Sequence, residues 1–155
     1  MSKENKTMNI QQKLQGIQSS LKAPKGQTNK FGGYRYRSAE DILTAVKPLL
    51  AEWACTLVIT DSIVEVGGRV YVKSTAVLAS TENGNENFIN VDAFAREAET
   101  KKGMDDAQIT GSASSYARKY ALNGLFAIDD TKDPDATNNH GSNLPKPTTK
   151  QTQGF

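Results

Sequence analysis

Two short segments of the chain alternate aromatic rings with cations, a combination that suits nucleic-acid binding. The first is Tyr34-Arg35-Tyr36-Arg37, which follows Phe31 and two glycines. In a β-strand the two tyrosines point to one face and the two arginines to the other. Tyrosine rings stack on bases and guanidinium groups bind phosphates, so all four are candidate DNA-binding residues. The alternative is that the rings pack on the core and the arginines lie in water.

The second segment lies in a predicted helix near the end of the folded region. Tyr116 and Tyr120 are four residues apart and therefore share one face of that helix. We expect this face to pack on the core. Arg118 and Lys119 project from an adjacent quarter of the helix, and we expect them to contact phosphates. Other cations can extend the basic surface before this helix and on the outer face of a sheet: Lys101, Lys102, Arg69, Lys73 and Arg96.

The net charge of +2 is unevenly spread along the chain. Residues 1–37 hold eight Lys or Arg and one Glu, which gives +7, and residues 38–128 hold eight Lys or Arg and twelve Asp or Glu, which gives −4. The remaining residues carry −1. A basic segment followed by a mildly acidic body indicates nucleic-acid binding, although a solvated basic tail explains the same charges.

Several kinds of catalytic site lack the residues that they need. No glycine is directly followed by lysine, so the Gly-Lys-Ser/Thr phosphate loop of ATP-driven strand exchange is absent. Cys55 is the only cysteine and His140 the only histidine. An intrachain disulfide, a Cys/His zinc site and Ser/His/Asp or Cys/His triads are therefore excluded. We expect no cofactor and no enzymatic activity.

The composition is that expected of a cytoplasmic protein. The chain is 37% hydrophobic and 23% charged, and no apolar run approaches the ~20 residues that a membrane helix needs. The N-terminal residues MSKENKTMNI lack the apolar stretch of a signal peptide. A single cysteine fits a reducing compartment.

Hydrophobic periodicity predicts an α+β fold with a β-β-β-α core, an antiparallel three-stranded meander packed on a helix. The strands are residues 55–66, 69–80 and 88–98, and Gly67-Gly68 forms the first hairpin turn. A helix at about residues 105–122 follows, and its many Gly, Ala and Ser residues allow a close approach to the sheet. We divide the chain into a basic arm with an amphipathic helix, a core domain and a disordered tail: residues 1–30, 31–130 and 131–155.

The amphipathic helix at residues 8–22 carries a narrow apolar stripe of Ile10, Leu14, Ile17 and Leu21. The stripe is too narrow for a core helix, so we expect it to dock on its own domain or on a neighbouring subunit. It has no obvious site in its own domain, the core is small and the sheet has exposed edges. We therefore predict a homo-oligomer of many subunits.

Two local signals bear on the other helices. Pro48 lies inside the apolar pattern that follows Ser38 and should kink that helix or divide it into two short ones. Asn123-Gly124 should end the last helix, with Leu125 and Phe126 folding back as its apolar contact.

Two long segments resemble the signature of the ERF (essential recombination function) family. They run from Gly111 to Asp133 and from Gly33 to Ile42, and the second is followed by Val46-Lys47-Pro48-Leu49-Leu50. The resemblance covers roughly residues 8–133. It implies ATP-independent binding of single-stranded DNA and annealing of complementary strands in phage recombination.

The same resemblance implies a β-β-β-α core that assembles into rings or filaments. The groove between the sheet and the following helix would hold the DNA backbone. The partners it implies are single-stranded DNA and further copies of the chain, with a phage exonuclease or a host single-strand-binding protein as additional ones. From the lack of a long apolar run we expect no membrane partner.

Three other functions stay open from the residues. A protein that only protects single strands would share the aromatic and basic features. A metal-dependent nuclease could use one of two acidic runs, although solvated turns and helix-dipole complementarity also explain them. A scaffold without DNA affinity is the third. The acidic runs are Asp129, Asp130, Asp133 and Asp135, and Glu97, Glu99, Asp105 and Asp106.

Overall fold

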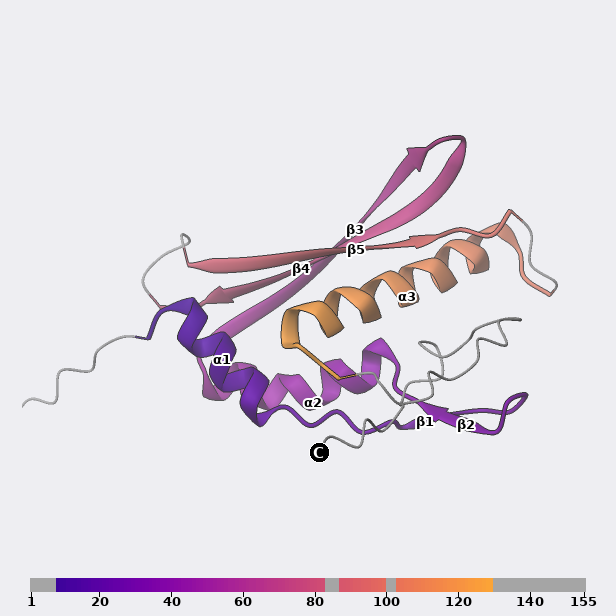
Figure 1. The fold of residues 1–155 in the computed structure, drawn as a ribbon. Coiled ribbons are helices and arrows are strands. Elements are labelled where there is room, and N and C mark those ends of the chain that lie inside the picture. The colour runs from indigo at the N-terminus through magenta and orange to yellow at the C-terminus, as the bar shows by residue number, and fades with distance from the viewer. Residues whose placement is uncertain (1–7, 83–86, 100–102, 130–155) are drawn as a thin grey trace, which may run out of the picture.

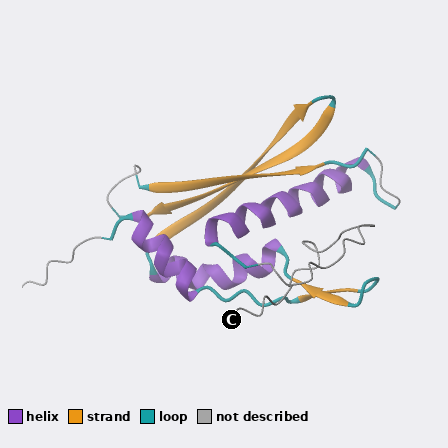
Figure 2. Cartoon of the chain, in the orientation of Figure 1, coloured by secondary structure: helices purple, strands orange, loops and turns teal. Residues whose placement is uncertain are grey.

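The computed structural model describes residues 8–82, 87–99 and 103–129. These residues form two antiparallel sheets and three helices, and all three helices lie on one side of the larger sheet (Figures 1 and 2). The predicted α+β class and its β-β-β-α core are confirmed. The predicted disordered tail at residues 131–155 lies outside the described residues. The elements are α1 (Ile10–Ser20), β1 (Gln27–Asn29), β2 (Tyr34–Tyr36), α2 (Ala39–Glu52), β3 (Cys55–Val66), β4 (Arg69–Ser80), β5 (Phe88–Arg96) and α3 (Asp106–Phe126).

The larger sheet is a meander in the order β3-β4-β5. β3 and β4 pair along their whole length, from Cys55 opposite Ser80 to Val66 opposite Arg69. The turn between them is Gly67-Gly68, and both glycines have positive φ angles, +61° and +77°. Glycine adopts this conformation without steric cost, which is why the pair was a reliable turn signal.

Helix α3 packs closely on the sheet because the residues between them are small. Ala113, Ala117 and Ala121 are buried on the face of α3 that contacts the sheet, and Val72 and Leu78 are buried on β4. An added Cβ at Gly124 would lie 3.2 Å from Cγ1 of Val91 on β5. The predicted role of small residues in a close helix–sheet approach is confirmed.

The predicted end of the last helix at Asn123-Gly124 is wrong. Helix α3 continues through both residues to Phe126, and Ala127 follows in the left-handed conformation with φ +52°. Leu125 and Phe126 are only 1% and 2% exposed, so they lie in the core as part of the helix instead of folding back on it. Burial of these two side chains outweighs the weak helix propensity of Gly124.

Helix α2 is one helix with Pro48 inside it, so of the two predicted outcomes, a kink or a division into two short helices, the division does not occur. Ser38 and Asp41 form a reciprocal capping box at its N-terminus. Ile42 and Val46 are completely buried against the core. The backbone hydrogen bond that Pro48 cannot donate is a smaller loss than the apolar burial that a break in the helix would expose.

Helix α1 has its docking site in its own domain, which corrects one reason for predicting assembly. Ile10, Leu14 and Ile17 are buried in the same hydrophobic cluster as residues of α2, α3 and the sheet. Gly16 lies directly against the ring of Trp53, where a Cβ would come within 2.4 Å. The narrow apolar stripe is enough to dock α1 on its own domain, because Gly16 has no side chain and lets the helix backbone lie close to Trp53.

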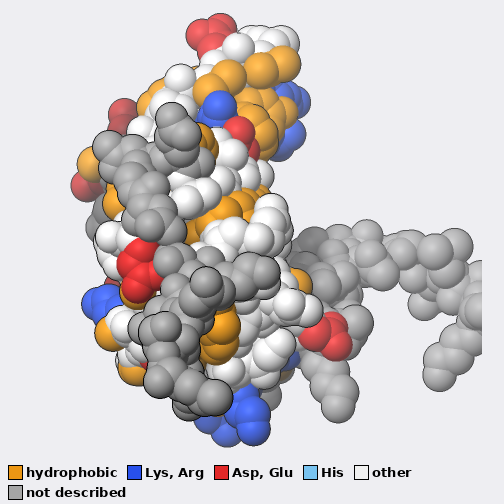
Figure 3. All heavy atoms as spheres, turned by 90° about the vertical axis from the view of Figure 1, so that its left-hand side faces the viewer, with side chains coloured by type: hydrophobic (Ala, Val, Ile, Leu, Met, Phe, Trp, Pro, Cys, Tyr) orange, Lys and Arg blue, Asp and Glu red, His pale blue; other side chains and the backbone are white. Residues whose placement is uncertain are grey.

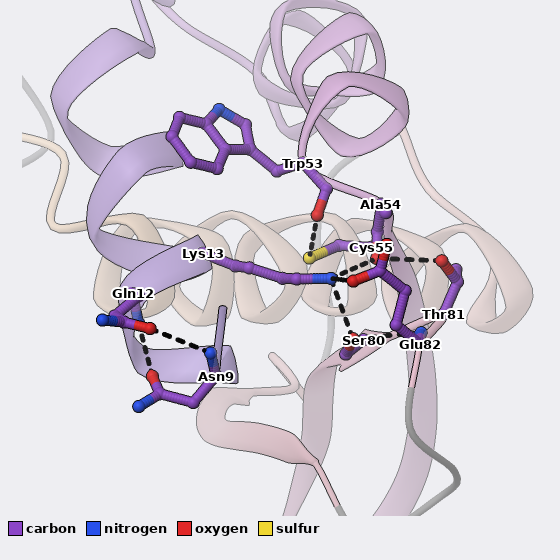
Figure 4. A network of polar contacts seen from close by, with 9 residues as sticks. All are labelled: Asn9, Gln12, Lys13, Trp53, Ala54, Cys55, Ser80, Thr81 and Glu82. Carbon is purple, nitrogen blue, oxygen red and sulfur yellow. Dashed lines mark hydrogen bonds and ion pairs between the residues drawn. The ribbon is translucent and has the colours of Figure 1, made fainter. Parts of the chain in front are cut away.

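A buried lysine ties α1 to the end of the sheet (Figure 4). Lys13 is 3% exposed, and its Nζ lies 3.2 Å from a carboxylate oxygen of Glu82. The same ammonium group donates to the hydroxyl of Ser80 at 2.9 Å and to the carbonyl of Ala54 at 3.2 Å. Burial of this charge is tolerated because all three acceptors surround it.

Within the described residues, no helix has the length and apolar character to span a membrane.

Candidate nucleic-acid interface

The two aromatic and basic segments meet in space, although they lie far apart in the sequence. β1 and β2 form a small hairpin in which Gln27 pairs with Tyr36. The rings of Tyr34 and Tyr36 lie edge to face at 6.4 Å between centroids. Nζ of Lys119 on α3 lies 5.9 Å from the centroid of the Tyr36 ring, a cation–π geometry.

Tyr116 and Tyr120 are exposed, so the expectation that they pack in the core is wrong. Their exposed fractions are 45% and 43%, and their rings stack with centroids 6.4 Å apart and planes inclined by 23°. The core face of α3 is instead the alanine stripe that includes Ala117. Successive helix residues are rotated by about 100°, so the tyrosines lie beside that face rather than on it.

Two pockets adjoin Tyr116 and together form what we call the α3 groove. One has a volume of about 410 Å³ and lies between β5 and α3, and the other, of about 240 Å³, lies between β2, the start of α2 and α3. Both are lined by Tyr116 and Ser112, which makes them neighbours on the same face of α3. The remaining lining includes Phe94, Arg96 and Tyr120 in the first pocket, and Tyr36, Arg37 and Lys119 in the second.

Arg118 and Lys119 do not form one basic patch. Lys119 is 3% exposed and lines the α3 groove. Arg118 points to the other side of α3, where its Nη2 lies 3.1 Å and its Nε 3.2 Å from Oδ2 of Asp61 on β3. A rotation of about 100° between neighbouring residues separates them. Viewed from the side of α1, basic side chains are likewise scattered among apolar and uncharged ones (Figure 3).

Comparison with known proteins places the chain in a family. The model of the ERF superfamily matches residues 10–154. The chain belongs to the ERF superfamily. It is 53% identical over 141 residues to the "Essential recombination function protein" of Salmonella phage P22, a match that covers 91% of this chain and 65% of that relative. The chain thus spans about two thirds of the length of this curated relative. No solved structure matches.

The two segments that carry the ERF resemblance supply one of the two pockets of the α3 groove completely and the other in part. Residues 33–42 supply β2 and the start of α2, while the segment from residue 111 onward supplies most of α3. The pocket of about 240 Å³ is lined entirely from these two segments. The two segments of the ERF signature, which are far apart in the sequence, therefore meet at the smaller pocket of the α3 groove.

The other predicted DNA-binding residues lie at different distances from the α3 groove. Arg37 lines it and donates from Nε to the carbonyl of Ala23 at 2.8 Å. Arg35 is exposed on the opposite face of the β1–β2 hairpin from the tyrosines. Lys73 lies on the sheet face away from α3, where it pairs with Asp92 at 3.6 Å. Lys101 and Lys102 lie outside the described residues.

Sequence reasoning placed Tyr116 and Tyr120 wrongly and left Phe94 out of the site. Phe94 lies opposite Lys73 and shares the outer face of β5 with Arg96, and both line the larger pocket because β5 is an edge strand beside α3. Strand alternation predicts the shared face but not the place in the α3 groove. The acidic residues that motivated a nuclease form no metal-binding group within the described residues. Asp130, Asp133 and Asp135 lie outside those residues.

Asp61 holds Arg118 and so joins α3 to β3. Its side chain is 24% exposed and also accepts hydrogen bonds from Ser114 and, at 2.6 Å, from the buried hydroxyl of Ser74. Burial by itself would raise the pKa of Asp61. The two hydroxyl donors and the Arg118 guanidinium outweigh that effect and lower the pKa below its ordinary value.

Asp61→Asn should lower the free energy of unfolding at neutral pH by about 1–2 kcal/mol, because a charge-assisted acceptor is lost from a partly exposed site. The pKa is lower in the folded state than in the unfolded one. The stabilisation is therefore complete above the unfolded pKa and is lost as the pH falls through the folded one. Denaturant unfolding from pH 7 down to pH 3 measures this. A difference between wild type and variant that stays constant to the lowest pH would contradict it.

Proposed function

We propose that this ERF chain binds single-stranded DNA in the α3 groove and anneals complementary strands in phage recombination, without ATP. The observation that carries the proposal is the exposed Tyr116–Tyr120 pair on α3, beside a buried face that has alanines at positions 113, 117 and 121. The two tyrosine rings are exposed instead of packing in the core, and they line pockets that also contain Arg96, Arg37 and Lys119. The name of the phage P22 relative supports a role in recombination.

The geometry suits annealing because stacking uses only the flat faces of the bases. Rings such as Tyr116 can hold a base by its face while its Watson–Crick edge stays accessible. Arg96, which is exposed, and Arg37, which is half-buried, are placed at the groove to contact phosphates, which carry no sequence information. Neutralising the phosphates of two strands lowers their mutual repulsion, and duplex formation then proceeds downhill without a nucleotide fuel.

Assembly into a ring or filament is part of the proposal, now on different grounds. The helix α1 is buried in its own domain, but the face of the sheet away from α3 exposes Val58 and Phe88 at 54% and 51%. β3 and β5 are also edge strands of the sheet. Exposed edges and apolar patches favour association between copies. Light scattering at micromolar concentration measures the subunit number.

The decisive experiment is an annealing assay on two complementary oligonucleotides with EDTA and without nucleotide. We expect pairing to be faster than the spontaneous reaction and both strands to stay intact. Affinity for one strand should fall with salt, with a slope of log affinity on log salt of about −2 or steeper, since each phosphate contact on a single strand contributes about −0.7.

Each alternative function gives a different result in the same assay. Salt-sensitive binding without faster annealing would indicate a protein that only protects single strands. Strand cleavage that appears when magnesium or manganese replaces EDTA would indicate a nuclease. A flat salt dependence would contradict the proposed electrostatic contacts.

A further inference from the structure

The turn of the β1–β2 hairpin presents an aromatic ring that nothing in the described structure covers. Phe31 is 103% exposed, as much as in an extended chain. The other exposed large hydrophobic residues among those described do not exceed 61%. In Figure 1 this hairpin projects from the end of the domain, beyond α2. A phenylalanine held fully in water requires a reason other than the stability of this domain.

Hydrogen bonds centred on Asn29 fix the shape of the turn. Oδ1 of Asn29 accepts from the backbone N–H groups of Phe31 at 2.8 Å and Gly32 at 3.1 Å. Nδ2 of Asn29 donates to the hydroxyl of Tyr34 at 2.8 Å, and the N–H of Gly33 donates to the carbonyl of Asn29 at 2.9 Å. Gly33 has φ +65°, a conformation that favours glycine. The ring of Phe31 is therefore held outward by a defined turn.

The surroundings of Phe31 are cationic and aromatic. Lys30 and Arg35 are exposed beside it, and residues 22–37 contain no Asp or Glu. On the inner face of the hairpin, Tyr34 and Tyr36 continue the aromatic surface to Lys119 in the α3 groove. In residues 22–37 aromatic rings alternate with cations and there are no carboxylates. Such a surface suits single-stranded DNA, because rings stack on bases and cations bind phosphates. The apolar pocket of a second copy would not call for the cations.

We propose that Phe31 stacks on a base of the bound single strand at the end of the α3 groove. This inference rests on the proposed function and deepens it, because it adds the β1–β2 hairpin to the DNA-binding surface. The strand runs from the α3 groove along Tyr36 and Tyr34 to Phe31, with Lys30 and Arg35 beside its phosphates. A base held on Phe31 is separated from its neighbour in the stack, while its Watson–Crick edge remains open for pairing.

The test uses the full chain and a labelled oligothymidylate, with the variants Phe31→Ala, Phe31→Leu and Phe31→Trp. Stacking on one base corresponds to about a 5- to 100-fold change in affinity. Alanine and leucine should both lose about that much, because leucine keeps the apolar surface but not the flat ring. Tryptophan should retain the affinity and lose fluorescence when DNA binds. Val66→Ala, at the exposed turn of the β3–β4 hairpin, is the matched control and should bind as wild type.

An oligonucleotide of abasic sites separates base stacking from contact with the backbone. On it, Phe31→Ala should bind as tightly as wild type. Wild-type affinity in both Phe31→Ala and Phe31→Leu would overturn this inference and leave the proposed function intact. Affinity lost with alanine but kept with leucine, together with fewer subunits, would overturn it in favour of a pocket on a second copy. A wild-type chain that binds no single strand would overturn the proposed function and this inference with it.

Discussion

Replacing both Tyr116 and Tyr120 with alanine should reduce affinity for single-stranded DNA at least about 30-fold and leave the fold intact. Each base–aromatic stack contributes about 1–3 kcal/mol, and two such contacts would be lost. Both rings are more than 40% exposed, and alanine is the best helix former, so the free energy of unfolding should change by about 1 kcal/mol or less. Fluorescence anisotropy with an oligothymidylate and thermal melting measure the two quantities.

The matched control is the double substitution to phenylalanine, which keeps both rings and removes only the hydroxyls. It should bind within a few-fold of wild type if stacking is the interaction. The opposite pattern, in which the double alanine variant binds normally but melts far earlier, would mean that the tyrosines belong to the core. That result would contradict the proposal that the α3 groove binds DNA through an exposed tyrosine pair.

Phe126→Ala should have the largest effect on stability, about 3–5 kcal/mol. The side chain is 2% exposed at the end of α3, and its removal leaves a cavity among Leu122, Leu125 and the other residues of the main core cluster. Small domains have only about 5–15 kcal/mol of stability in total, so the variant should be marginal. Urea unfolding followed by circular dichroism measures the change.

Phe88→Ala provides the same chemical change at an exposed site of β5. Phe88 is 51% exposed, and its replacement should cost less than about 1 kcal/mol in the monomer. If the two substitutions cost the same, Phe126 would not be a core residue.

The sheet was predictable because its signals are local. Residues 55–66 and 69–80 were predicted as strands and are β3 and β4 with the same bounds. β-branched residues at a period of two and a glycine pair with positive φ specify a hairpin without reference to the rest of the molecule. The same alternation explains the observed outward face of β5, which carries Phe88, Asn90, Asp92, Phe94 and Arg96.

The helix ends and docking sites were less predictable because they depend on distant partners. Gly124 is a stop signal in isolation, yet its missing Cβ makes room for Val91. Lys13 looks like a solvent-exposed residue of an amphipathic helix, yet its ammonium group is buried among acceptors from residues 54, 80 and 82. In each case a tertiary contact outweighs the local preference.

The sequence by itself determined the β-β-β-α core, the ERF family and the two segments that line the smaller pocket of the α3 groove. Only the tertiary structure decided which way the side chains of α3 face. Tyrosines four residues apart are equally compatible with a core face and an exposed one. Ala113, Ala117 and Ala121 took the middle of the core face, and larger buried residues such as Ile109 and Phe126 lie toward its two ends. Successive residues of a helix are rotated by about 100°, so burying one face fixes the direction of every other face. With the alanines buried, Tyr116 is exposed, Lys119 lies near Tyr36 and Arg118 pairs with Asp61.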